Sequence, residues 1–190
     1  MDKKVWLIRH GESTANAGAV TKNHITIPLS TTGQEQAKRV SLLIPESPAL
    51  IITSPFTRTL LTAKPTLERF PWAIHEVWNV QEFTHLAVEK YADTPYLEIK
   101  KKQHEYWERL DPDYIDGDSA ESFTMLLSRA KAAIDHLNRL PSGLVVMFTH
   151  AQFIRALRVL KENQNPNPQE LIKTFMSLPR VDNCEITKWE

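Results

Sequence analysis

The chain has 190 residues, a length that predicts one domain covering residues 1–190. Lys plus Arg and Asp plus Glu both number 23, so the formal net charge is zero. This balance argues against a nucleic-acid binder, which needs a basic surplus to displace counterions. A single cysteine, Cys184, excludes an internal disulfide and a cysteine-rich zinc site.

The apolar runs are too short for a membrane protein. The longest, such as 144–148, are about the length of a strand, so we expect no segment that crosses a bilayer and no membrane partner. Behind Lys3 and Lys4 the apolar run covers only 5–8, whereas a signal peptide needs roughly 7–15 apolar residues there. The sequence therefore predicts a cytoplasmic protein.

Three short apolar runs have the pattern of buried parallel strands, because they are continuous rather than alternating. They cover residues 5–8, 50–52 and 144–148, and a segment that can be helical follows each of them. Strands that alternate with helices predict an α/β fold. We expect a three-layer α/β/α sandwich with a mostly parallel central sheet.

The helix starts carry local signals. Residues 32–35 read Thr-Gly-Gln-Glu, a capping-box pattern, and 118–121 form a second cap before a periodic apolar helix. Pro55 is placed near the start of the helix after the second strand. Pro65 falls within that helix and is expected to kink or end it.

The stretch from about 77 to 118 is rich in aromatic residues and proline, and it fits the strand–helix alternation less well. We interpret it as a helical insertion with one helix, around 96–110, which covers part of the edge of the sheet. Residues 165–168 are expected to form a loop. Residues 183–189 alternate well enough for a final edge strand.

Ligands of open parallel sheets bind beyond the carboxyl ends of the strands. The three predicted strands are followed there by Arg9 and His10, by Arg58, and by His150. Two guanidinium groups would repel a metal ion, but their donor forks match phosphate oxygens. Cationic neighbours keep an imidazole neutral, and a neutral imidazole can attack phosphorus.

Four motifs carry a resemblance to a known family. The first is Arg-His-Gly-Glu-Ser at 9–13 with Asn16, and the second is Pro-Leu-Ser-Thr-Thr-Gly at 28–33 with Gln36 and Ala37. The third is Ser-Pro-Phe-Thr-Arg-Thr at 54–59 with Thr62 and Ala63, and the fourth is Thr149 with His150. In this order they resemble the histidine phosphatase superfamily, the phosphoglycerate mutase-like proteins. The resemblance covers most of the chain.

The resemblance implies a role for each matching residue. His10 is the nucleophile that becomes a phosphohistidine, while Arg9, Arg58 and His150 hold the phosphoryl oxygens. The spacing within the family points to Glu82 as the acid and base, with Glu12 and Glu76 as rivals. No metal and no organic cofactor are implied. Further substrate contacts are expected from Gly11, Thr14, Asn16, Ala151 and Gln152.

The sequence departs from the family pattern at three places. Ala151 stands where glycine commonly follows the second histidine, and Thr26 where many members have an acidic residue. After Glu82 the chain has Thr84, His85 and Leu86 in place of the usual glycine and tryptophan pattern. Of the remaining histidines, His85 is the most favoured to line the pocket, because it follows Glu82 so closely.

The aromatic insertion has two interpretations, a packed core and a lid over the site. The core is favoured, but Tyr91, Tyr96 or Trp107 could belong to a lid that sets substrate choice. Glu121 and Ser122 lie close to the predicted cap of the following helix, and a capping role is favoured for them over a place in the site.

The favoured function is a metal-independent phosphatase that hydrolyses a phosphomonoester through a phosphohistidine on His10. We prefer it to a phosphoglycerate mutase-type transfer because mutases of the family carry longer insertions over the site. A phosphate-binding regulatory module without turnover is the other alternative, and a coincidental motif ranks last. The substrate is a phosphorylated small molecule or a phosphoprotein. A monomer and a homodimer both remain open.

Overall fold

The computed structural model describes residues 3–19, 23–91, 94–163 and 167–189, without the side chain of Tyr96. Its centre is a five-stranded sheet in the order β3-β2-β4-β1-β5. Four strands run parallel, and β5 is antiparallel to β1 at the edge. The strands are β1 (Lys3–Arg9), β2 (Leu50–Thr53), β3 (Ile74–Val77), β4 (Gly143–Thr149) and β5 (Ile186–Trp189).

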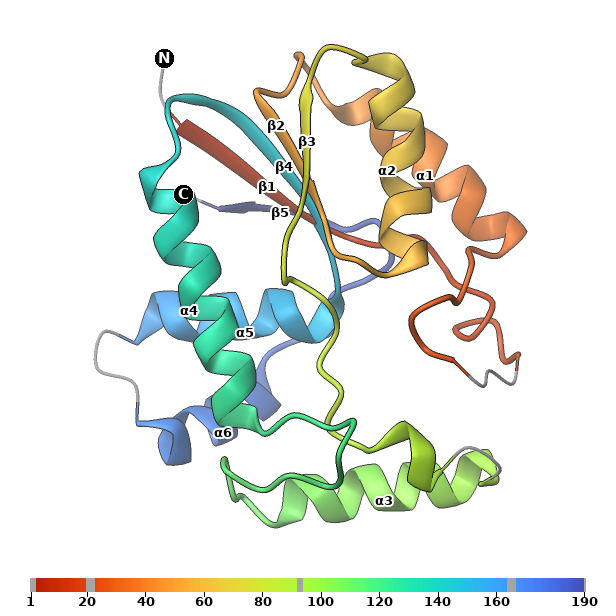
Figure 1. Cartoon of the computed structure of the whole chain (residues 1–190), viewed down its shortest axis with the longest axis vertical. Helices are drawn as coiled ribbons and strands as arrows, with labels where there is room; N and C mark the ends of the chain where they lie inside the picture. The colour runs from red at the N-terminus through yellow and green to blue at the C-terminus, as the bar shows by residue number, and fades with distance from the viewer. Residues whose placement is uncertain (1–2, 20–22, 92–93, 164–166, 190) are drawn as a thin grey trace.

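Helices cover both faces of the sheet, which confirms the predicted α/β/α sandwich (Figure 1). Helices α1 (Thr31–Leu43) and α2 (Thr57–Arg69) pack together on one face. The other face carries α4 (Phe123–Arg139), α5 (Ala151–Glu162) and α6 (Pro168–Ser177). The described part of the chain has no helix long and apolar enough to cross a membrane.

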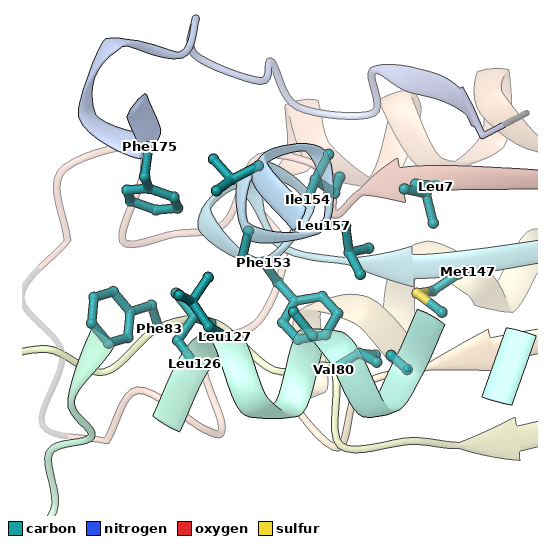
Figure 2. Close-up of a cluster of buried hydrophobic side chains, with 14 of the residues drawn as sticks. Leu7, Val80, Phe83, Leu126, Leu127, Met147, Phe153, Ile154, Leu157 and Phe175 are labelled. Carbon is teal, nitrogen blue, oxygen red and sulfur yellow. The ribbon is translucent and has the colours of Figure 1, made fainter. Parts of the chain in front are cut away.

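Strand β4 shows how one short run of apolar residues supports both layers. Leu144, Val146 and Phe148 belong to the core under α1 and α2, whereas Val145 and Met147 belong to the larger core under α4 and α5. This alternation follows from the two-residue period of a strand. Figure 2 shows the larger core, where the side chains of α4, α5 and the sheet meet.

Two helix caps differ from the prediction. The cap of α1 is Ser30, whose hydroxyl accepts the Gly33 N–H at 3.0 Å, two residues before the predicted Thr32. The cap of α4 is Ser122, which accepts from Met125 N–H, and not the predicted 118–121 segment. Several residues of capping type lie in a row at both places. Which of these residues becomes the cap depends on the direction from which the chain enters the helix. Tertiary packing sets that direction, and the local sequence does not show it.

Of the two effects expected of Pro65, a kink or an end of the helix, the structure excludes the end, because α2 continues to Arg69. A proline inside a helix removes one hydrogen bond and crowds the preceding turn. Here the guanidinium of Arg69 donates to the backbone carbonyls of Ser41 and Ile44, which ties the last turn of α2 to the end of α1. Tertiary packing therefore extends the helix past its proline.

The insertion contains the predicted helix as α3 (Tyr96–Glu108), preceded by a short 3₁₀ helix, η1 (Val88–Lys90). The expectation that it covers the edge of the sheet is wrong, because all four residues of the edge strand β3 are exposed. Helix α3 lies beyond the carboxyl ends of the strands instead (Figure 1). The Trp107 ring packs there on Phe83 and Phe175, with centroids 6.0 and 5.5 Å away.

Two elements and two boundaries were not predicted correctly. Strand β3 lacks an apolar run, since His75 and Glu76 occupy its centre. Helix α6 begins at Pro168, inside the predicted loop 165–168, of which 165 and 166 lie outside the described residues. The last strand begins at Ile186, three residues later than predicted, because 183–185 turn against the end of β1.

Candidate active site

The predicted convergence at the carboxyl rim of the sheet is present. Strands β1 and β4 pair in register up to Arg9 and Thr149, so the next residue of each strand emerges at the same level. The His10 N–H donates to the Thr149 carbonyl at 2.9 Å. The His10 and His150 rings then meet edge to face, with centroids 5.1 Å apart.

The hydrogen bonds of His10 determine which ring nitrogen carries the proton. Nδ1 lies 2.7 Å from the carbonyl oxygen of Gly11, which can only accept, so Nδ1 donates. Arg58 Nε, which can only donate, lies 3.1 Å from Nε2. The lone pair of Nε2 therefore faces the guanidinium. Burial, and then the charge of Arg58, lower the pKa of His10 to about 3, so the ring is neutral at pH 7.

The glycine of the first motif is required by a close approach of two backbone segments. A Cβ on Gly11 would lie 2.7 Å from the carbonyl oxygen of Gly33, and a Cβ on Gly33 would collide with Glu12. The Gly11 N–H donates to the Thr62 hydroxyl of α2 at 3.0 Å. Both polar backbone groups of Gly11 are thus engaged within the protein, and the residue holds the His10 ring in place.

Arg58 stands in the first turn of α2, which begins just beyond β2. Its Nη1 donates to the His24 carbonyl at 2.7 Å, and its guanidinium carbon lies 4.8 Å from the centre of the Phe56 ring. Burial lowers the pKa of Arg58 to about 10, so the group keeps its charge at neutral pH. A buried, fixed cation therefore lies against Nε2 of His10.

His150 is fully buried and is fixed by one of its nitrogens. Nε2 lies 2.7 Å from the Ser54 hydroxyl, while Nδ1 is buried and has no hydrogen-bond partner among the described residues. Burial and the nearby Arg58 hold its pKa well below the ordinary value. When the Ser54 hydroxyl donates to Nε2, the proton of the neutral ring lies on Nδ1, which can then donate to an oxyanion beside His10.

Arg9 and the backbone of His10 are held by a late segment of the chain. Arg9 Nη1 donates to the Val181 carbonyl at 2.8 Å, and the Asn183 side chain donates to the His10 carbonyl at 2.9 Å. The buried Arg9 Nε has no partner among the described residues, so one donor remains for an anion. Burial lowers the pKa of Arg9. Asn183 was not predicted, because its role depends on a contact across 173 residues.

Glu82 lies in the loop after β3, close enough to the two arginines for them to lower its pKa. Its Oε1 accepts the Phe83 and Gln152 N–H groups at 3.0 and 3.1 Å. These charges and bonds favour the ionised form, but burial outweighs them and raises the pKa of Glu82. A carboxyl group with a raised pKa is suited to donating a proton near neutral pH.

The two rival carboxylates are engaged elsewhere. Glu12 accepts the Ser30 hydroxyl at 2.6 Å, at the start of α1. Glu76 lies exposed on β3 and accepts the indole N–H of Trp78 at 2.7 Å. Among the carboxylates that the sequence singled out, the structure brings Glu82 alone to the cavity described next.

A cavity of about 730 Å³ extends from Arg58 and Glu82 toward the insertion. Asn16 lines it, as does His85, the histidine that was favoured for this place. The other predicted site residues, Arg9, His10, Gly11, Thr14, His150, Ala151 and Gln152, are not among its lining residues. The remaining lining residues come from the loop after β1, from the start of α2 and from the insertion: Ala15, Gly18, Ala19, His24, Phe56, Phe83, Thr84, Leu86, Ala87, Val88, Tyr91, Thr94, Ile99 and Gln103.

The residues considered for a lid separate into two groups. Tyr91 lines the cavity, whereas Trp107 packs into the core against Phe175. The side chain of Tyr96 lies outside the described part of the chain. Ser122 caps α4, the role that was favoured for it, whereas Glu121 does not cap the helix and pairs with Arg129 at 2.6 Å instead.

Comparison with known proteins places this site in a family. The family model of the histidine phosphatase superfamily (branch 1) matches residues 5–188. Over 187 residues the chain is 25% identical to the uncharacterized phosphatase PhoE of Bacillus subtilis, covering 97% of this chain and 90% of that protein. It is 31% identical over 144 residues to a probable phosphoglycerate mutase of Photorhabdus laumondii, covering 74% of this chain and 65% of that protein.

Solved structures show the same fold. An α-ribazole phosphatase from Shigella flexneri superposes with a TM-score of 0.75 at 21% identity, covering 97% of this chain and 89% of that one. A mycobacterial glucosyl-3-phosphoglycerate phosphatase gives 0.69 at 22% identity, covering 98% and 89%. Because the family model spans nearly the whole chain, the protein belongs to the histidine phosphatase superfamily, branch 1.

Proposed function

We propose that the protein is a metal-independent phosphatase that hydrolyses a phosphomonoester through a phosphohistidine on His10. The observation that carries the proposal is the bonding of His10. Its proton is held on Nδ1 by the Gly11 carbonyl, and its Nε2 lone pair faces Arg58. A nucleophile and the cation that would hold its target are thus placed at hydrogen-bond distance before any substrate arrives.

The first step forms a bond from His10 Nε2 to phosphorus and breaks the bond from phosphorus to the ester oxygen. Arg9, Arg58 and His150 would hold the phosphoryl oxygens, with donors that include the unpartnered Arg9 Nε and His150 Nδ1. Glu82, in its protonated form, would give its proton to the departing oxygen. Phosphoryl transfer depends mainly on such positioning and charge stabilisation, which buried, fixed donors supply without reorganisation.

The second step returns the enzyme to its starting state. Glu82, now ionised, would take a proton from water, whose oxygen attacks phosphorus as the bond to His10 Nε2 breaks. The products are inorganic phosphate and a neutral His10 ring. The raised pKa of Glu82 supports this double use, because a carboxyl that titrates closer to neutrality can both give and take a proton.

The names of the relatives include both a phosphatase and a mutase. The phosphatase match extends over 97% of the chain, the mutase match over 74%. The second alternative, a binding module without turnover, has against it the placement of Glu82 next to the two arginines. We therefore rank hydrolysis first.

The test is hydrolysis of p-nitrophenyl phosphate in the presence of a chelator. Wild type should turn over, and His10→Ala should lose roughly 10⁴-fold or more in kcat. His104→Ala is the matched control, because the exposed His104 lies on α3 and pairs with Glu108. A label from [³²P]phosphoester that is stable to base and labile to acid, in wild type and not in His10→Ala, would identify the phosphohistidine.

Other results would redirect the assignment. Activity that needs a bisphosphate primer would indicate a mutase. Phosphate binding without turnover on any ester would indicate the regulatory module. Hydrolysis that survives His10→Ala would contradict the proposed nucleophile.

A further inference from the structure

We propose that the end of the cavity remote from Arg58 is a binding subsite for a neutral organic group about as large as a sugar ring or a nucleoside, and that His85 is its polar anchor. The inference rests on the proposed function, since it describes the alcohol part of the phosphomonoester. It concerns substrate choice and not the transfer step.

Among the described residues that line the cavity, the charged side chains are confined to one end. Arg58 and Glu82 are the charged side chains among the described residues that line it. The other lining residues are apolar or carry neutral polar groups, including Asn16, Thr94 and Gln103. A second phosphate or a carboxylate placed among them would lose its water without gaining a cation. Burying an unpaired charge costs several kcal/mol, so the wall selects against anionic groups.

The size of the cavity also argues for an organic group of some bulk. Its volume of about 730 Å³ lies well within the range of sites for drug-sized ligands, which runs from roughly 300 to 1,000 Å³. A phosphoryl group bound between the arginines fills a small part of that space. Phe56, Phe83 and Tyr91 add aromatic surface to the walls, suited to packing against a ring.

His85 is a buried polar group that the protein itself leaves unsatisfied. The residue is 7% exposed, and neither ring nitrogen has a hydrogen-bond partner of normal geometry among the described residues. Aromatic rings hold the imidazole in place, with the centroids of Phe83, Tyr106 and Trp107 at 5.3, 5.0 and 5.5 Å. An unsatisfied buried donor and acceptor destabilise the free protein, and a ligand that bonds to them can recover this cost.

The protonation state of His85 suits a neutral partner. Burial lowers its pKa to about 4, against opposing effects of the Phe83 backbone and of Asp116. At pH 7 the ring therefore offers one N–H donor and one lone-pair acceptor, and no charge. A hydroxyl or an amide can bond to such a ring, whereas a carboxylate would gain no ion pair.

Matched pairs of substrates test the charge preference. Uridine 5′-monophosphate and orotidine 5′-monophosphate differ by one carboxylate on the base, whereas glucose 1-phosphate and glucuronic acid 1-phosphate share the sugar ring and differ only at C6, a hydroxymethyl group in the first and a carboxylate in the second. The carboxylate lies on the base in the first pair and on the sugar in the second, so the two pairs place it at different distances from the phosphate. We expect kcat/KM to favour the neutral member by about tenfold or more in at least one pair. Equal or greater activity on the acidic member of both pairs would overturn the inference.

His85→Phe tests the anchor while keeping an aromatic ring in the aromatic surroundings. The ratio of kcat/KM for the preferred neutral substrate to that for phenyl phosphate should fall about tenfold, because phenol carries no group for His85 to bond. His85→Gln should restore part of the ratio, and His104→Phe should leave it at the wild-type value. An unchanged ratio in His85→Phe would remove His85 from the proposal.

Binding measurements keep this inference separate from the proposed function. Calorimetry with His10→Ala and the same two pairs reports on the subsite without any turnover. Neutral members that bind more tightly, together with a wild type that hydrolyses nothing, would retain the subsite and reject the phosphatase. No preference in binding, together with normal hydrolysis of p-nitrophenyl phosphate, would reject the subsite and retain the phosphatase.

Discussion

The two ends of the cavity are built differently. At the phosphate end, Arg58 and Glu82 line the cavity, and His10 lies behind Arg58, in contact with it and with His150. His10, His150 and Arg58 follow the ends of adjacent strands, and each has a hydrogen-bond partner that fixes its position. At the far end, the walls come from the insertion, and His85 has unsatisfied ring nitrogens. Rigid strand ends suit a reaction that depends on placement. Loops attached to that scaffold can change the choice of substrate without disturbing the reaction.

Arg58→Ala is the strongest test of the view that one end of the cavity serves the reaction and the other the choice of substrate. The substitution removes the cation that lies against His10 Nε2, and kcat should fall about 100- to 1000-fold for every phosphomonoester alike. Arg69→Ala, at the other end of the same helix, is the control. It breaks bonds to the Ser41 and Ile44 carbonyls, so it should lower stability and leave kcat near wild type. A loss confined to one substrate would contradict a general phosphate-binding role.

The pH profile examines the acid at the phosphate end. The role proposed for Glu82 requires its protonated form, so we expect its contribution to be present below its raised pKa and to fall about tenfold per pH unit above it. We expect this alkaline limb in kcat/KM for phenyl phosphate, and a weaker one for p-nitrophenyl phosphate, whose leaving group needs little help. The limb should vanish in Glu82→Gln and persist in Glu76→Gln. A limb that survives Glu82→Gln would assign the acid elsewhere.

The stability of the protein at acid pH tests the environment of His85 at the far end of the cavity. His85 stays neutral in the folded protein down to pH about 4, whereas in the unfolded chain it takes a proton below its ordinary pKa of 6.5. Lowering the pH from 7 to 5 therefore favours unfolding, by about 2 kcal/mol from this residue. Urea unfolding at both values should show a loss smaller by that amount in His85→Phe. An equal loss in both proteins would mean that His85 is not buried in its neutral form.

The smallest expected effect concerns the support of the nucleophile. Asn183→Ala removes the hydrogen bond to the His10 carbonyl, worth about 1 kcal/mol, so kcat should fall about fivefold with KM nearly unchanged. Asn138→Ala, an exposed position near the end of α4, is the control. A rise in KM without a change in kcat would show that Asn183 acts on binding and not on the position of His10.

Elements with a local signal could be predicted from the sequence. Strand β4 is a continuous apolar run between a glycine and the Thr149–His150 motif, and α5 follows it with apolar residues at helical spacing. Strand β3 has no such signal, because an exposed edge strand needs no apolar residues. Helix α6 did carry one, since proline at the first position after an asparagine cap is a common helix start.

The residues of the site also differ in whether the local sequence gives a signal for them. His10, Arg58 and His150 each follow a strand with a clear pattern, so the topology alone predicted that they would meet. Asn183 and the carbonyl of His24 reach the site through contacts across long stretches of chain, and nothing in their local sequence indicates it. The orphaned nitrogens of His85 are likewise a property of packing.

The place of β1 has a consequence for the order in which the protein acquires its structure during synthesis. Residues 3–9 pair with β4 and β5, which are made from residues 143–149 and 186–189. The segment that carries the nucleophile therefore waits for its partners until most of the chain has left the ribosome. Closing so long a loop is slow, and a nascent chain holds unpaired apolar strands meanwhile. The chain should become active in one late event, when its last strand joins its first.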